Sequence, residues 1–322
     1  MKFAMLGAGG IGCYFAARLI DAGHECVLVA RGEHLEALQT NGLHLEHPDF
    51  QYHSSVESTD VAGLCQGYAC DHFDLLILGA KSGATSSILD EMKPWLEQGN
   101  TPMLSIQNGV TNEEHIELKV GRERTIGGLG NYISGHIESP GHVKVQGAGQ
   151  IEFGAWPNTD SNPTMAELCH TLEAVFKDAG IQTRLYENVR YALWRKLVLN
   201  NGVNPLTALT AQKTGFVTTD PILSRTVRNM MEETARAANV AGVKISAADV
   251  EEMFDLISNF GDIKTSMQVD MERGRSLEVN EICGPVIEYC RRISQPAETT
   301  ELIYRLLVNA DELAIKPSQL GR

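Results

Sequence analysis

The chain has 322 residues, of which 43% are hydrophobic and 21% charged, values that suit a globular protein of two domains. Its formal net charge of −14 argues against nucleic acid or an anionic membrane surface as a partner. No apolar run reaches transmembrane length and the chain starts with a strand pattern instead of a signal peptide, so we expect a cytoplasmic protein.

The first element pattern is a strand, a glycine-rich turn, a helix and a second strand within residues 1–31. An apolar run over residues 2–6 is followed by the G-x-G-x-x-G sequence Gly7, Ala8, Gly9, Gly10, Ile11 and Gly12. Gly7 allows a tight turn, Gly9 lets the backbone approach a pyrophosphate, and Gly12 lets the helix pack closely on the strand. Free N–H groups at the helix start favour phosphate binding. The pattern predicts a dinucleotide site, the alternative being a glycine-rich turn of an ordinary α/β domain.

The residue after the second strand predicts which dinucleotide binds. An NAD site usually has an acidic residue there, which accepts a hydrogen bond from the ribose 2′-OH. This chain has Arg31, whose guanidinium can pair with a 2′-phosphate and stack on adenine. We therefore expect NADP (NADPH) as the cofactor, the alternative being a solvated surface arginine.

The next elements alternate between helices and apolar strands. Helices are predicted over residues 33–41, 82–97 and 112–120, the last with Asn112 as its N-cap, and strands over 43–46, 51–53, 75–78 and 103–106. Such alternation predicts a parallel sheet, which binds ligands at the carboxyl ends of its strands. Lys81 and Asn108 follow two of these strands and are site candidates. Their alternatives are a solvated lysine and a turn-forming Asn-Gly pair.

The second half of the chain changes to helices. Antiparallel strands are predicted within residues 125–154, a polar loop over 158–163, a helix over 164–179 and a strand over 181–185. Helical patterns then cover residues 189–201, 220–241, 247–260, 277–293 and 299–312, before a frayed tail at 315–322. The predicted fold class is α/β, with an N-terminal Rossmann-type parallel-sheet domain (1–187) followed by an all-α C-terminal domain (188–322).

Cysteines and histidines restrict the chemistry. The seven cysteines form no C-x-x-C motif, so we expect free thiols in a reducing cytosol, with a Cys65–Cys70 redox pair as the alternative. All ten histidines lie at or before His170, so no histidine of the second half can be the general acid. We expect no metal in the site.

One helical stretch carries polar residues on one face. Lys196, Asn200 and Asn204 are four residues apart and share a helix face, which is costly to bury without partners. They form either a site or a helix end that is capped by Asn204 before Pro205, with Lys196 reaching solvent. The residues alone leave both interpretations open.

The sequence resembles the 2-dehydropantoate 2-reductase (ketopantoate reductase) family over nearly its whole length. The resemblance rests on the glycine turn, on Gln107-Asn108-Gly109, and on two helical stretches: ALWRKLVLNNGVNPLTA at 192–208, and KTSMQ at 264–268 continuing through ERGR to Glu278. It implies a Rossmann domain and a helical domain with the active site in the cleft. There NADPH would give hydride to the ketone of a 2-oxo acid, in pantothenate biosynthesis.

The resemblance also implies a role for each site residue. Lys196 would donate a proton to the developing alkoxide, and Glu278 would lie near the substrate hydroxyl and the nicotinamide. Asn200 and Asn204 would bind substrate, and Ser266 its carboxylate. Lys81 and Asn108 match positions that contact the cofactor, with Asn108 also at the substrate.

The chain departs from the family pattern at three positions. Asn280, Cys283 and Thr214 stand where the family often has Asp, Asn and Asn, so the identity of the 2-oxo acid substrate is less constrained than the reaction. Two alternatives follow: a reductase of the same fold for another 2-oxo acid, and an inactive NADP-sensing binding protein. Lys196 and Glu278 argue against the sensor. A homodimer through the helical domain stays open.

Overall fold

The computed structural model describes residues 1–319 and divides into two compact units. The first covers Met1–Ala192, and the second begins at Leu193. The boundary falls inside helix α7 (Val189–Thr210), whose first residues belong to the first unit. The predicted fold class, a Rossmann-type parallel-sheet domain followed by an all-α domain, is confirmed.

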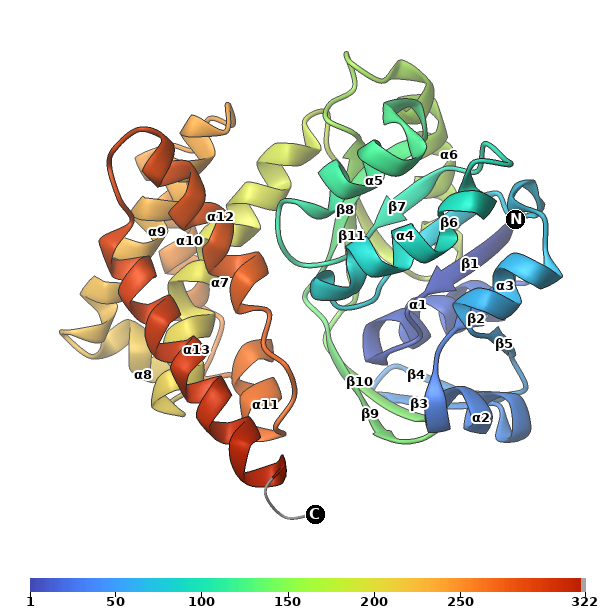
Figure 1. Cartoon of the computed structure of the whole chain (residues 1–322), viewed down its shortest axis with the longest axis horizontal. Coiled ribbons are helices and arrows are strands. Elements are labelled where there is room, and N and C mark those ends of the chain that lie inside the picture. Colours follow the sequence, from blue (N-terminus) through green and yellow to red (C-terminus); the bar gives the residue numbers. More distant parts are fainter. Residues whose placement is uncertain (320–322) are drawn as a thin grey trace. The chain divides into compact units, whose positions relative to one another are not determined.

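The first unit is built on an eight-stranded sheet with the order β12-β11-β8-β7-β6-β1-β2-β5 (Figure 1). Its strands are β1 (Lys2–Leu6), β2 (Glu25–Val29), β5 (Glu57–Thr59), β6 (Leu75–Leu78), β7 (Met103–Ser105), β8 (Thr125–Asn131), β11 (Gln150–Ala155) and β12 (Gln182–Leu185). Neighbours from β5 to β8 are parallel, and β11 is antiparallel to β8. The order reverses between β1 and β6, which is where such sheets bind ligands.

The strands are apolar because both faces of the sheet are covered. Along β1, Phe3 and Met5 enter one core cluster while Ala4 and Leu6 enter the other, as alternation along a strand requires. Helices α3 (Val61–Gly67), α4 (Thr85–Leu96) and α5 (Asn112–Val120) contribute to the second cluster; α1 (Gly10–Asp21), α2 (Gly32–Asn41) and α6 (Pro163–Asp178) contribute to the first.

A second sheet of four strands also belongs to the first unit. Its order is β4-β3-β10-β9, with bounds β3 (Leu43–His47), β4 (Phe50–Ser54), β9 (Ser134–Ser139) and β10 (His142–Gln146). Figure 1 shows the blue strands β3 and β4 beside the green β9 and β10, and β3 pairs with β10 in parallel. The expected antiparallel run over 125–154 is therefore wrong in part, because β8 and β10 each also pair in parallel with an earlier strand.

The second unit is helical. Besides most of α7 it contains α8 (Thr214–Thr219), α9 (Leu223–Val240), α10 (Ala247–Asn259), α11 (Ser266–Glu272), α12 (Val279–Arg292) and α13 (Glu298–Gln319). The expected end of the first helix at residue 201 is wrong, because α7 continues through Pro205 to Thr210. The short helices α8 and α11 were not expected. Residues 315–319 of the expected frayed tail extend α13, and 320–322 lie outside the described residues.

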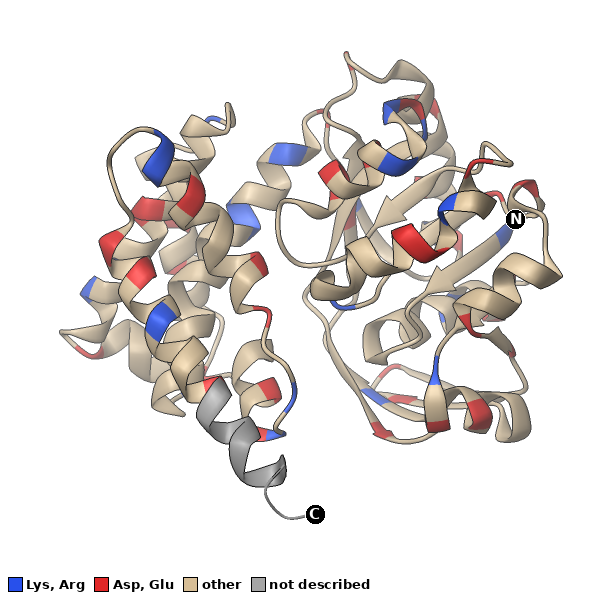
Figure 2. Ribbon diagram, in the orientation of Figure 1, with Lys and Arg blue, Asp and Glu red and all other residues tan. Residues whose placement is uncertain are grey.

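Charged residues of both signs are dispersed along the backbone of both units, as Figure 2 shows. None of the described helices combines the length and apolarity that crossing a bilayer requires. All seven cysteines are free thiols; Cys65 is half-buried and the other six are buried, so the Cys65–Cys70 pair is not bonded.

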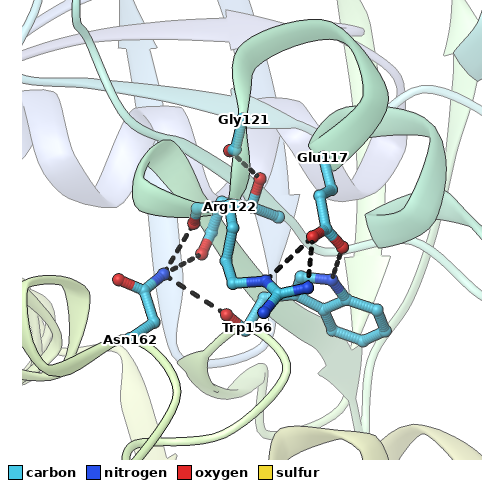
Figure 3. A network of polar contacts seen from close by, with 6 residues as sticks. Glu117, Gly121, Arg122, Trp156 and Asn162 are labelled. Atoms are coloured by element: carbon cyan, nitrogen blue, oxygen red, sulfur yellow. Dashed lines mark hydrogen bonds and ion pairs between the residues drawn. The ribbon is translucent and has the colours of Figure 1, made fainter.

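A polar network fixes the edge of the main sheet where β8 begins (Figure 3). The Glu117 carboxylate accepts hydrogen bonds from the Arg122 guanidinium at 2.9 Å and from the Trp156 indole N–H at 2.8 Å. The Asn162 amide donates to the backbone carbonyl oxygen of Arg122 at 2.6 Å. Because β8 is parallel to β7, this edge is opposite the carboxyl ends of β6 and β7. We assign this network to stability and not to the site.

Candidate functional site

The glycine turn lies at the carboxyl end of β1, against the ends of its two neighbouring strands. The backbone N–H groups of Gly7 and Ala8 donate to the carbonyl oxygen of Val29, the last residue of β2, at 3.1 and 2.8 Å. A Cβ on Gly7, whose φ is +108°, would lie 2.4 Å from the backbone nitrogen of Ala80, just after β6. Gly7 is therefore required both by its backbone conformation and by close approach.

The start of α1 has the form of a phosphate site. A Cβ on Gly9 would have no atom within 4 Å, so the backbone there is open to a ligand. Gly9 is the N-cap of α1, no side chain caps the helix, and its first turn holds no acidic residue. Gly12 packs on the turn, since its Cβ would lie 2.2 Å from the Gly7 carbonyl oxygen. The N–H groups of Gly10, Ile11 and Gly12 are thus left to donate hydrogen bonds to an anion.

Arg31 lies two residues beyond β2 and is the N-cap of α2. Its side chain is exposed, and within the described chain its guanidinium has no hydrogen-bond or ion-pair partner. It lies two residues after Val29, whose carbonyl oxygen accepts the hydrogen bonds of the glycine turn. Arg31 therefore lies at the same end of the sheet as that turn. A cation at this position can receive a 2′-phosphate without first giving up another partner.

The loops that carry Lys81 and Asn108 are tied together. Lys81 is exposed and follows β6, while Asn108 is half-buried and follows β7. The Ser82 hydroxyl donates to the backbone carbonyl oxygen of Asn108 at 2.6 Å, and the Gln107 amide donates to that of Ala80 at 2.7 Å. The structure therefore brings the two loops to one edge of the sheet, as their positions in the sequence predicted.

The first turn of α5 stabilises the loop that carries Asn108. The helix is N-capped by Thr111 in place of the expected Asn112. The Asn112 amide instead donates to the carbonyl oxygen of Asn108 at 2.8 Å, and its oxygen accepts from the Thr85 hydroxyl at 3.0 Å. Asn112 is thus occupied in holding a site loop, and this role had no signal in the sequence.

Glu113 is a buried acid next to this loop. Its side chain is 0% exposed, one carboxyl oxygen accepts a 3.4 Å hydrogen bond from the Gly128 N–H, and the other has no partner among the described residues. Burial raises the pKa of Glu113 to about 7, although the hydrogen bonds oppose that shift. Its pattern, a Glu-Glu pair in a first helical turn, is typical of solvated residues and gave no sign of burial.

In the second unit, α7 carries the predicted polar face. Lys196 is half-buried, whereas Asn200 and Asn204 are 7% and 3% exposed. Because α7 continues through Pro205, the interpretation that Asn204 caps a helix end is wrong. Two buried asparagines one turn apart, in line with a lysine, require polar partners of their own.

The start of α11 is bonded to the same helix. The Thr207 and Thr265 hydroxyls lie 2.6 Å apart, and Thr207 also donates to the Asn204 carbonyl oxygen at 3.0 Å. Thr265 is the N-cap of α11, so Ser266 is its first helical residue, and it is exposed. The structure thereby places Ser266 next to a residue that contacts α7.

Glu278 occupies the N-terminus of another helix. It is the N-cap residue of α12, is half-buried, and makes no capping hydrogen bond with its side chain.

The three departures from the family pattern occupy different environments. Cys283 is 0% exposed within α12, and burial raises the pKa of its thiol. Thr214 is also buried, and its hydroxyl donates to the Gly261 carbonyl oxygen at 2.9 Å. Asn280 is exposed and accepts a 2.8 Å hydrogen bond from the Tyr304 hydroxyl. Cys283 and Thr214 therefore act in packing rather than at an open surface.

Asn201, beside the predicted site residue Asn200, is a structural residue that sequence reasoning passed over. Its amide nitrogen donates to the Thr234 and Thr300 hydroxyls at 2.9 and 3.1 Å. The Glu233 carboxylate in turn accepts the backbone N–H of Thr300 at 2.8 Å. These bonds fix α7 to α9 and α13 on a side of the helix that adjoins its polar face.

Known proteins share both units. The profile described as ketopantoate reductase PanE/ApbA matches residues 3–158, and the C-terminal profile of the same family matches residues 188–310. The 2-dehydropantoate 2-reductase of Pyrococcus horikoshii is 28% identical over 313 residues, which are 97% of this chain and 98% of that protein.

Solved structures agree with these matches. The crystal structure of 2-dehydropantoate 2-reductase from Geobacter metallireducens is 29% identical with a TM-score of 0.85, covering 96% of this chain and 100% of that one. D-mandelate dehydrogenase with NADH and anilino(oxo)acetate has a TM-score of 0.88 at 21% identity, covering 98% and 99%, which is a likeness of fold alone. With family profiles matching both of its units, the chain belongs to the ketopantoate reductase family of oxidoreductases.

Proposed function

We propose that the protein reduces the ketone of 2-dehydropantoate, or of a closely related branched 2-oxo acid, to the 2-hydroxy acid with NADPH. The family supports the reaction class, since relatives over nearly the whole chain are named 2-dehydropantoate 2-reductase. The observation that carries the proposal is the α7 face, where Lys196 stands in line with the buried Asn200 and Asn204. A sensor of cofactor alone has no need of a proton donor there.

The first unit supports dinucleotide binding through its own backbone. The open approach at Gly9 and the uncapped N-terminus of α1 fit a pyrophosphate, and the exposed Arg31 fits a 2′-phosphate. D-mandelate dehydrogenase has the same fold with NADH, so the fold does not choose between the dinucleotides, and Arg31 is the residue that favours NADPH. Bound NADPH supplies the hydride.

The second unit supplies the acid. Hydride addition to the carbonyl carbon turns the carbonyl oxygen into an alkoxide, which needs a proton as it forms. The Lys196 ammonium polarises the carbonyl and gives its proton to that oxygen, and the neutral amine is then reprotonated from solvent. The Asn200 and Asn204 amides bind and orient the substrate, and the exposed Ser266 hydroxyl donates to its carboxylate. Glu278 completes the site near the substrate hydroxyl.

Consumption of NADPH, measured with a panel of 2-oxo acids, tests the proposal. The panel contains 2-dehydropantoate, an unbranched 2-oxo acid and an aryl 2-oxo acid, each with NADPH and with NADH. We expect the highest kcat/KM for 2-dehydropantoate with NADPH. Preference for another acid would identify the reductase alternative, and NADPH binding without turnover on any acid would identify the sensor.

The seven free thiols suit a reducing compartment and support action in the cytoplasm.

A further inference from the structure

The outward face of the second sheet carries a cluster of imidazoles and a carboxylate. Along β3 and β10 the apolar side chains are buried: Leu43, Leu45, Val143 and Val145. The alternate residues His44 and Glu46 on β3, and His142 on β10, therefore share the opposite face. His142 pairs directly with His44 in the parallel register. None of these residues has a part in the proposed reduction.

The three side chains converge on one point. The Nε2 atom of His142 lies 3.1 Å from Oε1 of Glu46, and the Nε2 atom of His44 lies 3.9 Å from the same oxygen. One ligand atom from each residue lies within 4.8 Å of the other two. Tetrahedral zinc, with bonds of about 2.0–2.2 Å, separates its ligand atoms by roughly 3.3 Å. The cluster is therefore close to a metal-binding arrangement before any metal is present.

Neighbouring rings hold the imidazoles in place. The His44 ring stacks on His142, with centroids 4.4 Å apart and planes 10° apart, and on its other side it stacks on His53 of β4 at 4.9 Å. The side chains of His44, Glu46 and His142 are 46%, 38% and 27% exposed, so an ion can reach them and water can complete its coordination. Small rotations of partly exposed side chains are enough to close the remaining gap.

We propose that His44, Glu46 and His142 form a binding site for a divalent transition-metal ion of the zinc class. Two imidazole nitrogens and one carboxylate oxygen are a ligand set that zinc uses with water in the open position. The site would join β3 to β10, whose ligands Glu46 and His142 are 96 residues apart in sequence. A bound ion would therefore stabilise the second sheet.

Lys144 opposes a cation at this position. Its ammonium lies 3.9 Å from Oε2 of Glu46, whereas the two imidazole distances are to Oε1. Figure 2 shows residues of both signs on this sheet, and His136 on β9 is already paired with Glu138 at 2.8 Å. The Lys144 side chain is 49% exposed and can turn into solvent when an ion arrives. Removal of Lys144 should consequently strengthen metal binding, whereas removal of an exposed lysine elsewhere should have no effect on it.

The test is calorimetric titration of the untagged full-length protein with ZnCl₂, together with the d–d absorption spectrum of the Co²⁺-loaded protein. We expect about one equivalent per chain and at least a tenfold weaker affinity, as an order of magnitude, in Glu46→Gln and His142→Gln. Lys144→Ala should bind more tightly. Circular dichroism checks that each variant folds, and Glu46→Gln keeps the size of the side chain that it replaces.

Three control variants separate this site from other donors of the same chain. His170→Ala removes an exposed histidine on α6, Cys65→Ser removes the half-buried thiol, and His24→Ala removes the imidazole 3.1 Å from the terminal amine. Each should bind zinc like the original protein. The proposal is overturned if Glu46→Gln and His142→Gln bind unchanged, if a control variant abolishes binding, or if the original protein binds no zinc.

Discussion

A Cβ atom on Gly10 would lie 2.2 Å from the carbonyl carbon of Gly135, so α1 and β9 meet where there is no room for a side chain. Gly9, the preceding residue, has no neighbour within 4 Å of the same hypothetical atom. Two adjacent positions of one motif thus require glycine for different physical reasons. Gly10 allows the second sheet to pack on the helix, and Gly9 leaves the backbone open on the ligand side.

This difference predicts that one alanine variant loses stability and the other loses cofactor affinity. Gly10→Ala should lower the free energy of unfolding by about 1–3 kcal/mol, because β9 has to move away from α1. Gly9→Ala should leave stability almost unchanged, since the φ of −80° suits alanine, but should weaken NADPH binding by narrowing the approach. Denaturant unfolding and fluorescence titration measure the two effects. Equal losses of stability would contradict the assignment.

Arg31→Ala tests the cofactor choice. Without the guanidinium the 2′-phosphate has no charged partner at this corner, so the KM for NADPH should rise about tenfold, equivalent to about 1.4 kcal/mol. The KM for NADH should stay nearly constant, because that dinucleotide has no 2′-phosphate. Steady-state kinetics with both cofactors provide the measurement. A preference of the original protein for NADH would contradict this reading of Arg31.

Lys196→Ala tests the general acid. Loss of a positioned proton donor typically slows a reaction on the order of a hundred- to ten-thousandfold, so kcat should fall by that much while NADPH binding changes little. Lys81→Ala is the matched control on the cofactor side, where we expect weaker NADPH binding first. If Lys196→Ala keeps a near-normal kcat with a good substrate, the proton comes from another group.

Glu113→Gln tests the buried acid beside the Asn108 loop. The pKa of this carboxyl rises from 4.5 to about 7 on folding, so below pH 4.5 it is protonated in both states. As pH rises from 4.5 towards 7, the unfolded chain releases the proton first, and the folded state loses stability on the order of 3 kcal/mol. Glutamine has no proton to lose, so the variant should not show this decrease.

Denaturant unfolding across that pH range, for the variant and the original protein, measures the difference. Glu114→Gln is the matched control, because this neighbouring glutamate is exposed. Its stability should follow the original protein at every pH. A Glu113→Gln curve parallel to the original one would show that Glu113 is ionised in the folded state.

Much of the main sheet was predictable because its signal is local. The apolar run of β1, the turn from Gly7 and the apolar run of β6 are each continuous in sequence, and each buried strand is nearly free of polar residues. The second sheet was not predictable as a unit. The pairing of β3 with β10 joins segments that lie far apart in the sequence, and no pattern in either segment indicates which strand it pairs with.

The candidate site shows the same division. Lys196, Asn200 and Asn204 share a face through helical spacing alone, so their grouping could be predicted. The tie from Thr207 to Thr265 joins residues 58 positions apart and depends on packing. Burial of Glu113 likewise depends on what covers α5, and a Glu-Glu pair looks the same in a solvated helix. The end of this helix was also predicted wrongly, because a proline such as Pro205 indicates a helix end, yet α7 continues through it.

The parallel pairing of β10 with β3 also bears on how the first unit folds. The β3–β4 hairpin closes locally, whereas β10 returns to β3 only after the chain has passed through strands β5 to β8 of the main sheet. Contacts of such sequence separation carry a large loop-closure entropy and form slowly. During synthesis the edge of β3 that pairs with β10 would stay unpaired until residue 146 has emerged. The glycine turn, which packs on β9 through Gly10, would acquire its final support in that same late step.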